Sequence, residues 1–61
     1  MDEQDKKELQ ECARALLVAN SEIGEVIGRL YRHNLQEDNI DNLQGIYYRI
    51  AAIIIDIQPS K

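Results

Sequence analysis

The residues that could take part in chemistry are few and far apart. The chain of 61 residues has one cysteine, Cys12, and one histidine, His33. It contains no nucleophile–base pair, glycine-rich phosphate loop or pair of histidines. Nothing basic is placed to activate the thiol of Cys12, which we expect to lie in the core. The sequence therefore predicts a protein that is not an enzyme and that holds no metal or cofactor.

Three glycines and two tyrosines form the first candidate binding site. Gly24, Gly28 and Gly45 interrupt stretches with helical patterns, and each costs up to ~1 kcal/mol relative to alanine. In a hairpin of two helices, Gly24 is expected near Tyr48, and Gly28 near Gln44 and Gly45. One interpretation is a groove for a ligand or partner, floored by glycine backbone and walled by Tyr47 and Tyr48. The other is that the tyrosine rings fill the notches, or that small residues allow the helices to approach closely.

A basic and aromatic group forms the second candidate site. Tyr31, Arg32 and His33 are consecutive, and Arg29 and Arg49 are expected close to them. Aromatic rings among arginines can stack on the bases of single-stranded nucleic acid. The alternative is an ordinary solvated face on which nearby glutamates at helical spacing neutralise the arginines.

Residues 46–57, IYYRIAAIIIDI, must position these candidates because they are the most apolar stretch of the chain. Apolar residues recur there and just before at alternating spacings of three and four, which is typical of a helix packed on partner helices. They are Ile40, Leu43, Tyr47, Ile50, Ile54 and Ile57. Isoleucine also favours strands, but no second strand is available for pairing. The pattern predicts a helix over residues 39–57.

The first half of the chain predicts a longer helix over residues 3–33. A row of large residues and a row of mostly small ones each recur at intervals of seven: Leu9, Leu16, Ile23 and Leu30, and Cys12, Ala19 and Val26. Such rows let facing helices interdigitate in layers. Ala13, Asn20 and Ile27 widen the apolar stripe. Asn20 could fix the helix register, or it could lie at the edge of the stripe.

Capping residues mark the ends of both helices. Asp2 is placed to cap the first helix, and Asn34 can adopt the left-handed conformation that ends it. The N-cap of the second helix is expected at one of three residues: Asp38, Asn39 or Asp41. Pro59 ends the second helix. The sequence thus predicts an all-α antiparallel helical hairpin that forms a single domain, residues 1–61.

A hairpin of this size leaves apolar surface uncovered. A chain of 61 residues with one cysteine is only marginally able to bury a core alone. Ile46 and Ile53 flank the second helix's seam on one side, and Tyr48 and Ile55 on the other. We therefore expect a homo-oligomer, with a dimer favoured, in which two hairpins form a four-helix bundle. The expected interface residues are Leu16, Ile23, Ile46, Ile50, Ile53, Ile54, Ile55 and Ile57.

Charge and hydropathy narrow the partner classes and the location. The net charge of −4 disfavours nonspecific binding to nucleic acid or to an anionic membrane. The longest apolar run, residues 50–55, is far shorter than a membrane span. The acidic N-terminus is the opposite of a secretory signal. We expect a cytoplasmic protein.

In this layout the chain resembles the plasmid repressor-of-primer family, whose members are helical hairpins of nearly the same length. The resemblance covers the whole outline and rests on architecture and on the alternation of large and small residues. It implies a dimer that binds paired RNA loops through Lys, Asn, Gln and one Phe on its first helix. The corresponding face here is mainly acidic, and the chain has no Phe. No functional residue can therefore be carried over.

These observations favour a small acidic protein-interaction module, acting as a regulator, adaptor or inhibitor of the phage or plasmid type. Its positive basis is an apolar surface larger than one hairpin can bury. A nucleic-acid-binding bundle that uses the end at Arg29–His33 is the second hypothesis. A protein that sequesters a small ligand between the glycines and tyrosines is the third.

Overall fold

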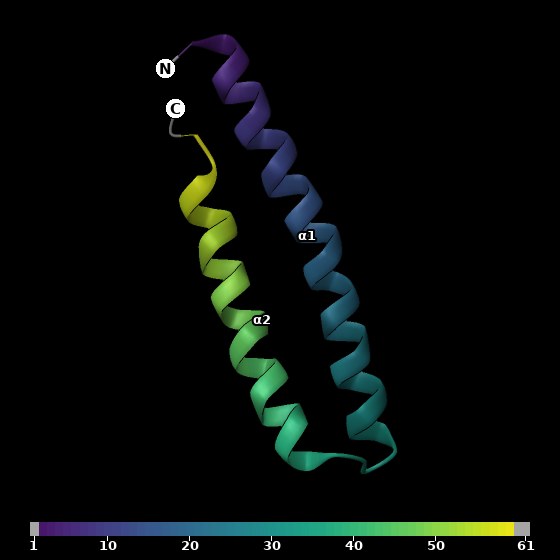
Figure 1. The fold of residues 1–61 in the computed structure, drawn as a ribbon. Coiled ribbons are helices and arrows are strands. Elements are labelled where there is room, and N and C mark those ends of the chain that lie inside the picture. Colours follow the sequence, from purple (N-terminus) through teal and green to yellow (C-terminus); the bar gives the residue numbers. More distant parts are fainter. Residues whose placement is uncertain (1, 60–61) are drawn as a thin grey trace.

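The computed structural model describes residues 2–59, so residues 1, 60 and 61 of the predicted domain lie outside the described part. Two helices, α1 (Glu3–Arg32) and α2 (Glu37–Ile57), lie side by side and antiparallel, with a short connection at one end (Figure 1). The predicted all-α hairpin is confirmed, and residues 50–55 are helical rather than a strand. Because α1 has 30 residues and α2 has 21, α1 extends beyond α2 at the open end.

The first turn of α1 is capped as the sequence predicts. Asp2 is the N-cap, and its Oδ1 accepts a hydrogen bond of 2.8 Å from the backbone N–H of Asp5. Two acidic residues, Glu3 and Asp5, lie in this turn, where the partial positive charge of the helix dipole stabilises carboxylates. Local chemistry therefore fixes where α1 begins.

The C-terminal end of α1 is closed by a Schellman motif. His33 is the C-cap, and Asn34 follows with a φ of 55°, in the left-handed region. The N–H of Leu35 donates to the carbonyl of Leu30 at 3.0 Å, and that of Asn34 donates to Tyr31 at 3.2 Å. These two bonds satisfy carbonyls that the helix end leaves free. The predicted role of Asn34 is confirmed.

The start of α2 differs from the prediction. Gln36, rather than Asp38, Asn39 or Asp41, is the N-cap, and the three predicted residues lie inside the helix. Gln36 has a φ of 54° and makes no side-chain capping bond, although its carbonyl accepts from the N–H of Ile40 at 2.9 Å. The Schellman motif reverses the chain within four residues, so the helix can begin earlier than side-chain capping alone indicates.

The C-terminal end of α2 follows the prediction. The helix ends at Ile57, and Gln58 is extended, with φ −65° and ψ 132°. This is the conformation that a following proline, here Pro59, imposes on its neighbour.

The two helices meet along one narrow seam. The α2 seam is confirmed, because Ile40 and Ile54 are buried and its other members are half-buried. On α1 the residues that face α2 are Leu9, Ala13, Leu16, Asn20, Ile23, Ile27 and Leu30. Ala13 and Asn20 are the most deeply buried of them, each 4% exposed.

In the seam, the large residues of α1 are accompanied by Ala13, Asn20 and Ile27 and not by the predicted row of Cys12, Ala19 and Val26. Cys12, Ala19 and Val26 are exposed, so Cys12 does not lie in the core between α1 and α2 as predicted. Both candidate rows flank the same large residues with spacings of three and four, and a single neighbouring helix covers only one of them. In this hairpin α2 covers the row that begins at Ala13.

The hairpin is a single layer of two helices. Its Cα atoms span 48 × 15 × 13 Å. Only three apolar residues of the described part are buried, namely Ala13, Ile40 and Ile54. Neither α1 nor α2 combines the length and the apolarity needed to cross a membrane.

Candidate functional site

The glycine and tyrosine candidates meet at one point only. A Cβ atom added to Gly24 would lie 3.1 Å from Cε1 of Tyr47, which is closer than ordinary van der Waals contact. The sequence predicted that Tyr48 lies at this notch, but the ring that fills it belongs to Tyr47. Tyr47 is a seam residue, whereas Tyr48 points about 100° further around the helix and is 69% exposed. The two rings pack edge to face, with centroids 5.7 Å apart.

The other two glycines do not extend this notch into a groove. The nearest neighbour of a Cβ on Gly28 is Nη1 of Arg32 on the same helix, at 3.5 Å. A Cβ on Gly45 would meet nothing within 4 Å. The predicted proximity of Gly28 and Gly45 is therefore wrong, because these two residues point away from the seam. The structure supports the interpretation in which a tyrosine ring fills the notch at Gly24.

Asn20 makes a polar link between the two helices. Its Nδ2 donates a hydrogen bond of 3.1 Å to the backbone carbonyl of Tyr47, 27 residues away in the sequence. Oδ1 of Asn20 is buried and has no hydrogen-bond partner. A bond to one particular carbonyl of α2 is satisfied in one alignment of the helices only. The structure thus places Asn20 in the seam, where it can fix the register.

Four of the basic and aromatic candidates lie at the turn end of α1, whereas Arg49 is exposed on α2, two residues after the Tyr47 that Asn20 binds. Arg29 and Arg32 are exposed in its last turn, as predicted, and Tyr31 is 70% exposed. Tyr31 shares a shallow depression with Glu37 and Asp41 of α2. Two carboxylates beside the ring of Tyr31 weaken the positive potential that a nucleic acid backbone requires.

The residues predicted for the oligomer interface fall into two groups. Five of them lie in the seam between the helices of one chain: Leu16, Ile23, Ile50, Ile54 and Ile57. Ile46, Ile53 and Ile55 are exposed. Ile53 and Ile55 point in directions about 200° apart around the helix axis, because each residue turns the helix by about 100°. These two isoleucines therefore belong to different faces of the hairpin.

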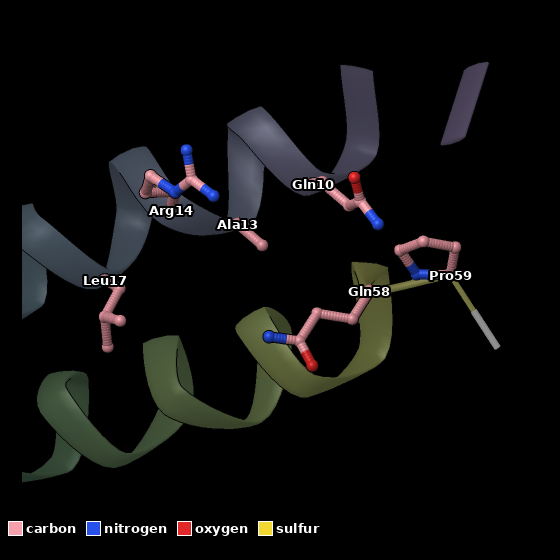
Figure 2. Close-up of a pocket in the computed structure, with 6 residues that line it drawn as sticks. All are labelled: Gln10, Ala13, Arg14, Leu17, Gln58 and Pro59. Atoms are coloured by element: carbon pink, nitrogen blue, oxygen red, sulfur yellow. The ribbon is translucent and has the colours of Figure 1, made fainter. Parts of the chain in front are cut away.

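A surface depression that the sequence did not predict shows which residues of the two helices lie on the same side of the hairpin. It lies at the open end and is lined by Gln10, Ala13, Arg14 and Leu17 of α1, and by Gln58 and Pro59, which follow α2 (Figure 2). The early end of α2 beside a longer α1 was the signal in the sequence that could have located it. The depression at Tyr31 lies on the same side of the hairpin, because residues seven apart share a helix face. Tyr31 is two heptads after Leu17, and Glu37 is three heptads before Gln58.

The first flat side of the hairpin, which we call the glutamine face, follows from these two depressions. It consists of two rows with heptad spacing: Gln10, Leu17, Gly24 and Tyr31 of α1, and Glu37, Gln44, Ala51 and Gln58 near or on α2. Tyr48 and Ile55 lie on α2 next to this face. The surface mixes amides with exposed apolar and aromatic side chains.

The opposite flat side, which we call the apolar face, consists of the remaining rows beside the seam. Its residues are Cys12, Ala19 and Val26 of α1, and Ile46 and Ile53 of α2. All five are exposed, and none carries a charge. The rows beside the seam therefore differ between the two sides of the hairpin. Cys12, Ala19, Val26, Ile46 and Ile53 lie on one side, and polar residues mixed with apolar ones lie on the other.

The described residues, 2–59, contain no cluster of three or more His, Cys, Asp or Glu side chains that could hold a metal ion. Comparisons of the chain with models of protein families, with curated proteins and with solved structures gave no match.

Proposed function

We propose that this chain is a noncatalytic protein-interaction module that works as a helical homo-oligomer and binds another protein as a regulator, adaptor or inhibitor. The observation that carries the proposal is the unused apolar surface of the hairpin. Nine large apolar side chains of the described part are exposed, against three apolar residues that are buried. Exposed apolar side chains that gather on one face of a monomer commonly mark a binding surface.

The glutamine face has the composition of a surface for a different protein. Leu17, Tyr31, Tyr48 and Ile55 on or beside it are 55%, 70%, 69% and 73% exposed. Amides and charged groups separate them. Exposed tyrosines among polar residues are typical of interfaces between partners that also exist apart. We assign the heterologous partner to this face.

Affinity capture tests the proposal. The full chain is immobilised and exposed to nuclease-treated extract of cells that make the protein, and bound proteins are identified by mass spectrometry. Tyr48→Ser and Ile55→Ser should lose the partner, since both side chains lie beside the glutamine face and are exposed in the hairpin. Ala15→Ser, on the side of α1 away from the glutamine face, is the control and should retain it.

Two outcomes contradict the proposal. If a protein is captured from untreated extract but not from nuclease-treated extract, a nucleic acid links it to the chain, and the chain is a nucleic-acid binder. If the partner binds both Tyr48→Ser and Ile55→Ser as well as the unchanged chain, the glutamine face is not its binding surface.

A further inference from the structure

No residue between 2 and 59 covers the apolar face. Val26, Ile46 and Ile53 are 46%, 43% and 49% exposed. Cys12 and Ala19, which lie beside them, are also exposed. Because these five side chains are uncharged, their removal from water is favourable. Two charged and exposed residues, Glu22 and Arg49, border the face, each three or four residues from two of its members.

The area that remains exposed matches what a dimer buries. The chain of 7.0 kDa exposes 5147 Å², whereas a folded monomer of that mass exposes roughly 4,000 Å². The excess is about 1,100 Å² for one chain. A stable interface covers roughly 800 Å² on each partner. Covering that much of each chain with a second copy therefore removes most of the excess.

The shape of the apolar face is complementary to itself. Its α1 row is small at Cys12 and Ala19, while its α2 row carries the two isoleucines. Asn20 binds the carbonyl of Tyr47, so Ala19 lies level with the α2 segment between Ile46 and Ile53. When two such faces meet about a two-fold axis, the isoleucines of each copy lie over the small residues of the other. The same pair of contacts then forms twice.

We propose that the apolar face is the dimer interface, and that it binds the apolar face of a second copy to form an antiparallel four-helix bundle. This inference rests on the homo-oligomer of the proposed function and adds which surface forms it. The glutamine face then stays on the outside of the bundle, free for a different protein. Ile53 lies inside the interface, and Ile55 lies outside it.

A matched pair of substitutions tests the assignment. Ile53→Glu and Ile55→Glu place the same charge at two exposed positions of α2, on opposite faces. In the dimer, Ile53→Glu buries two unpaired carboxylates, which should raise the dissociation constant roughly a hundredfold or more. Ile55→Glu should leave it within about threefold. Sedimentation equilibrium distinguishes the dimer, about 14 kDa, from the chain of 7.0 kDa.

A second pair of substitutions guards against loss of folding in one variant. Ala19→Glu lies on the apolar face, whereas Ala52→Glu lies on the side of α2 opposite the seam; both alanines are exposed in the hairpin. Ala19→Glu should dissociate the dimer, and Ala52→Glu should not. The two substitutions have the same intrinsic helix propensity, so only the position differs.

Cys12 provides a test in the unchanged protein. Its thiol is exposed in the single hairpin but lies inside the proposed interface. The rate at which a maleimide labels Cys12 should fall at least about tenfold as the concentration rises through the dissociation constant. In Ile53→Glu the rate should be independent of concentration.

The outcomes separate this inference from the proposed function. A dimer that survives both Ile53→Glu and Ala19→Glu, or one that Ile55→Glu dissociates, overturns the assignment of the face but leaves the homo-oligomer. An unchanged protein that stays a folded monomer across the micromolar range overturns the homo-oligomer as well. A dimer on the apolar face that captures no protein partner overturns the heterologous function alone.

Discussion

Asn20 is the residue on which the alignment of the two helices depends. It is 4% exposed, and its amide N–H₂ donates to the carbonyl of Tyr47. That carbonyl has two lone pairs, so it can accept this bond and still serve the α2 backbone. A carboxylate at this position could not donate the bond and would be buried with its charge.

We therefore expect Asn20→Asp to lower the free energy of unfolding by about 2–3 kcal/mol or more at pH 7. The burial favours the neutral acid in the folded state, so the folded state binds more protons than the unfolded chain. The loss should accordingly be smaller at pH 4 than at pH 7, each measured against the unchanged protein at the same pH. Urea unfolding followed by circular dichroism measures it.

The control for this prediction is Asn42→Asp. Asn42 is exposed on α2, so the same substitution there should change stability by less than about 0.5 kcal/mol. If Asn20→Asp and Asn42→Asp behave alike, the bond to Tyr47 does not hold the register.

Gly24 and Gly45 make a second comparison at the scale of single residues. Gly24→Ala gains helix propensity, up to ~1 kcal/mol, but its methyl group meets Cε1 of Tyr47 at 3.1 Å. Crowding of this kind costs about 1–3 kcal/mol, so we expect no stabilisation. Gly45→Ala meets nothing within 4 Å and should stabilise the protein by about 0.5–1 kcal/mol. Thermal melts measure both effects. If the two variants have equally raised melting temperatures, the methyl group at Gly24 is not crowded by Tyr47.

At the scale of elements, the connection between α1 and α2 contains a strained residue. Gln36 adopts a φ of 54° without being a glycine. For an L-residue the left-handed conformation costs about 1–2 kcal/mol, and glycine does not incur this cost. Glycine loses more conformational entropy on folding, but this loss is smaller, about 0.5–1 kcal/mol. Gln36→Gly should therefore stabilise the hairpin by up to ~1 kcal/mol.

The same change in an ordinary helical position supplies the control. Gln44 is exposed within α2, and Gln44→Gly should destabilise the protein by up to ~1 kcal/mol. Chemical unfolding should thus give opposite signs for the two substitutions. Equal losses would mean that Gln36 is not strained.

The two helices could be predicted from the sequence, because spacings of three and four persist through each of them and local caps such as Asp2 and Asn34 mark their ends. What could not be predicted is which side of α1 faces α2. Ala13 and Cys12 both lie beside the large row, and only the geometry of the turn decides between them. The same uncertainty of about 100° placed Tyr48 rather than Tyr47 at Gly24. The candidate site was therefore known by residue type and not by face.

At the scale of the whole molecule, stability should depend on protein concentration. A dimer is favoured over the unfolded monomer by mass action, so the melting midpoint should rise as the concentration increases across the micromolar range. Circular dichroism at each concentration checks this expectation. Ile53→Glu should melt at one lower temperature throughout, whereas Ile55→Glu should follow the unchanged protein. A midpoint that does not depend on concentration contradicts the dimer.

The closed turn at Asn34 also sets an order of events in time. Residues 30 and 35 bond locally, whereas Asn20 and Tyr47 are 27 residues apart in the sequence. Loop closure is fastest for the shortest loops, so pairing of the helices begins at the turn and proceeds towards the open end. This step is unimolecular and should finish within microseconds to milliseconds. If the proposed dimer forms, contact with a second copy should then follow as a slower phase, whose rate rises in proportion to the concentration of hairpins.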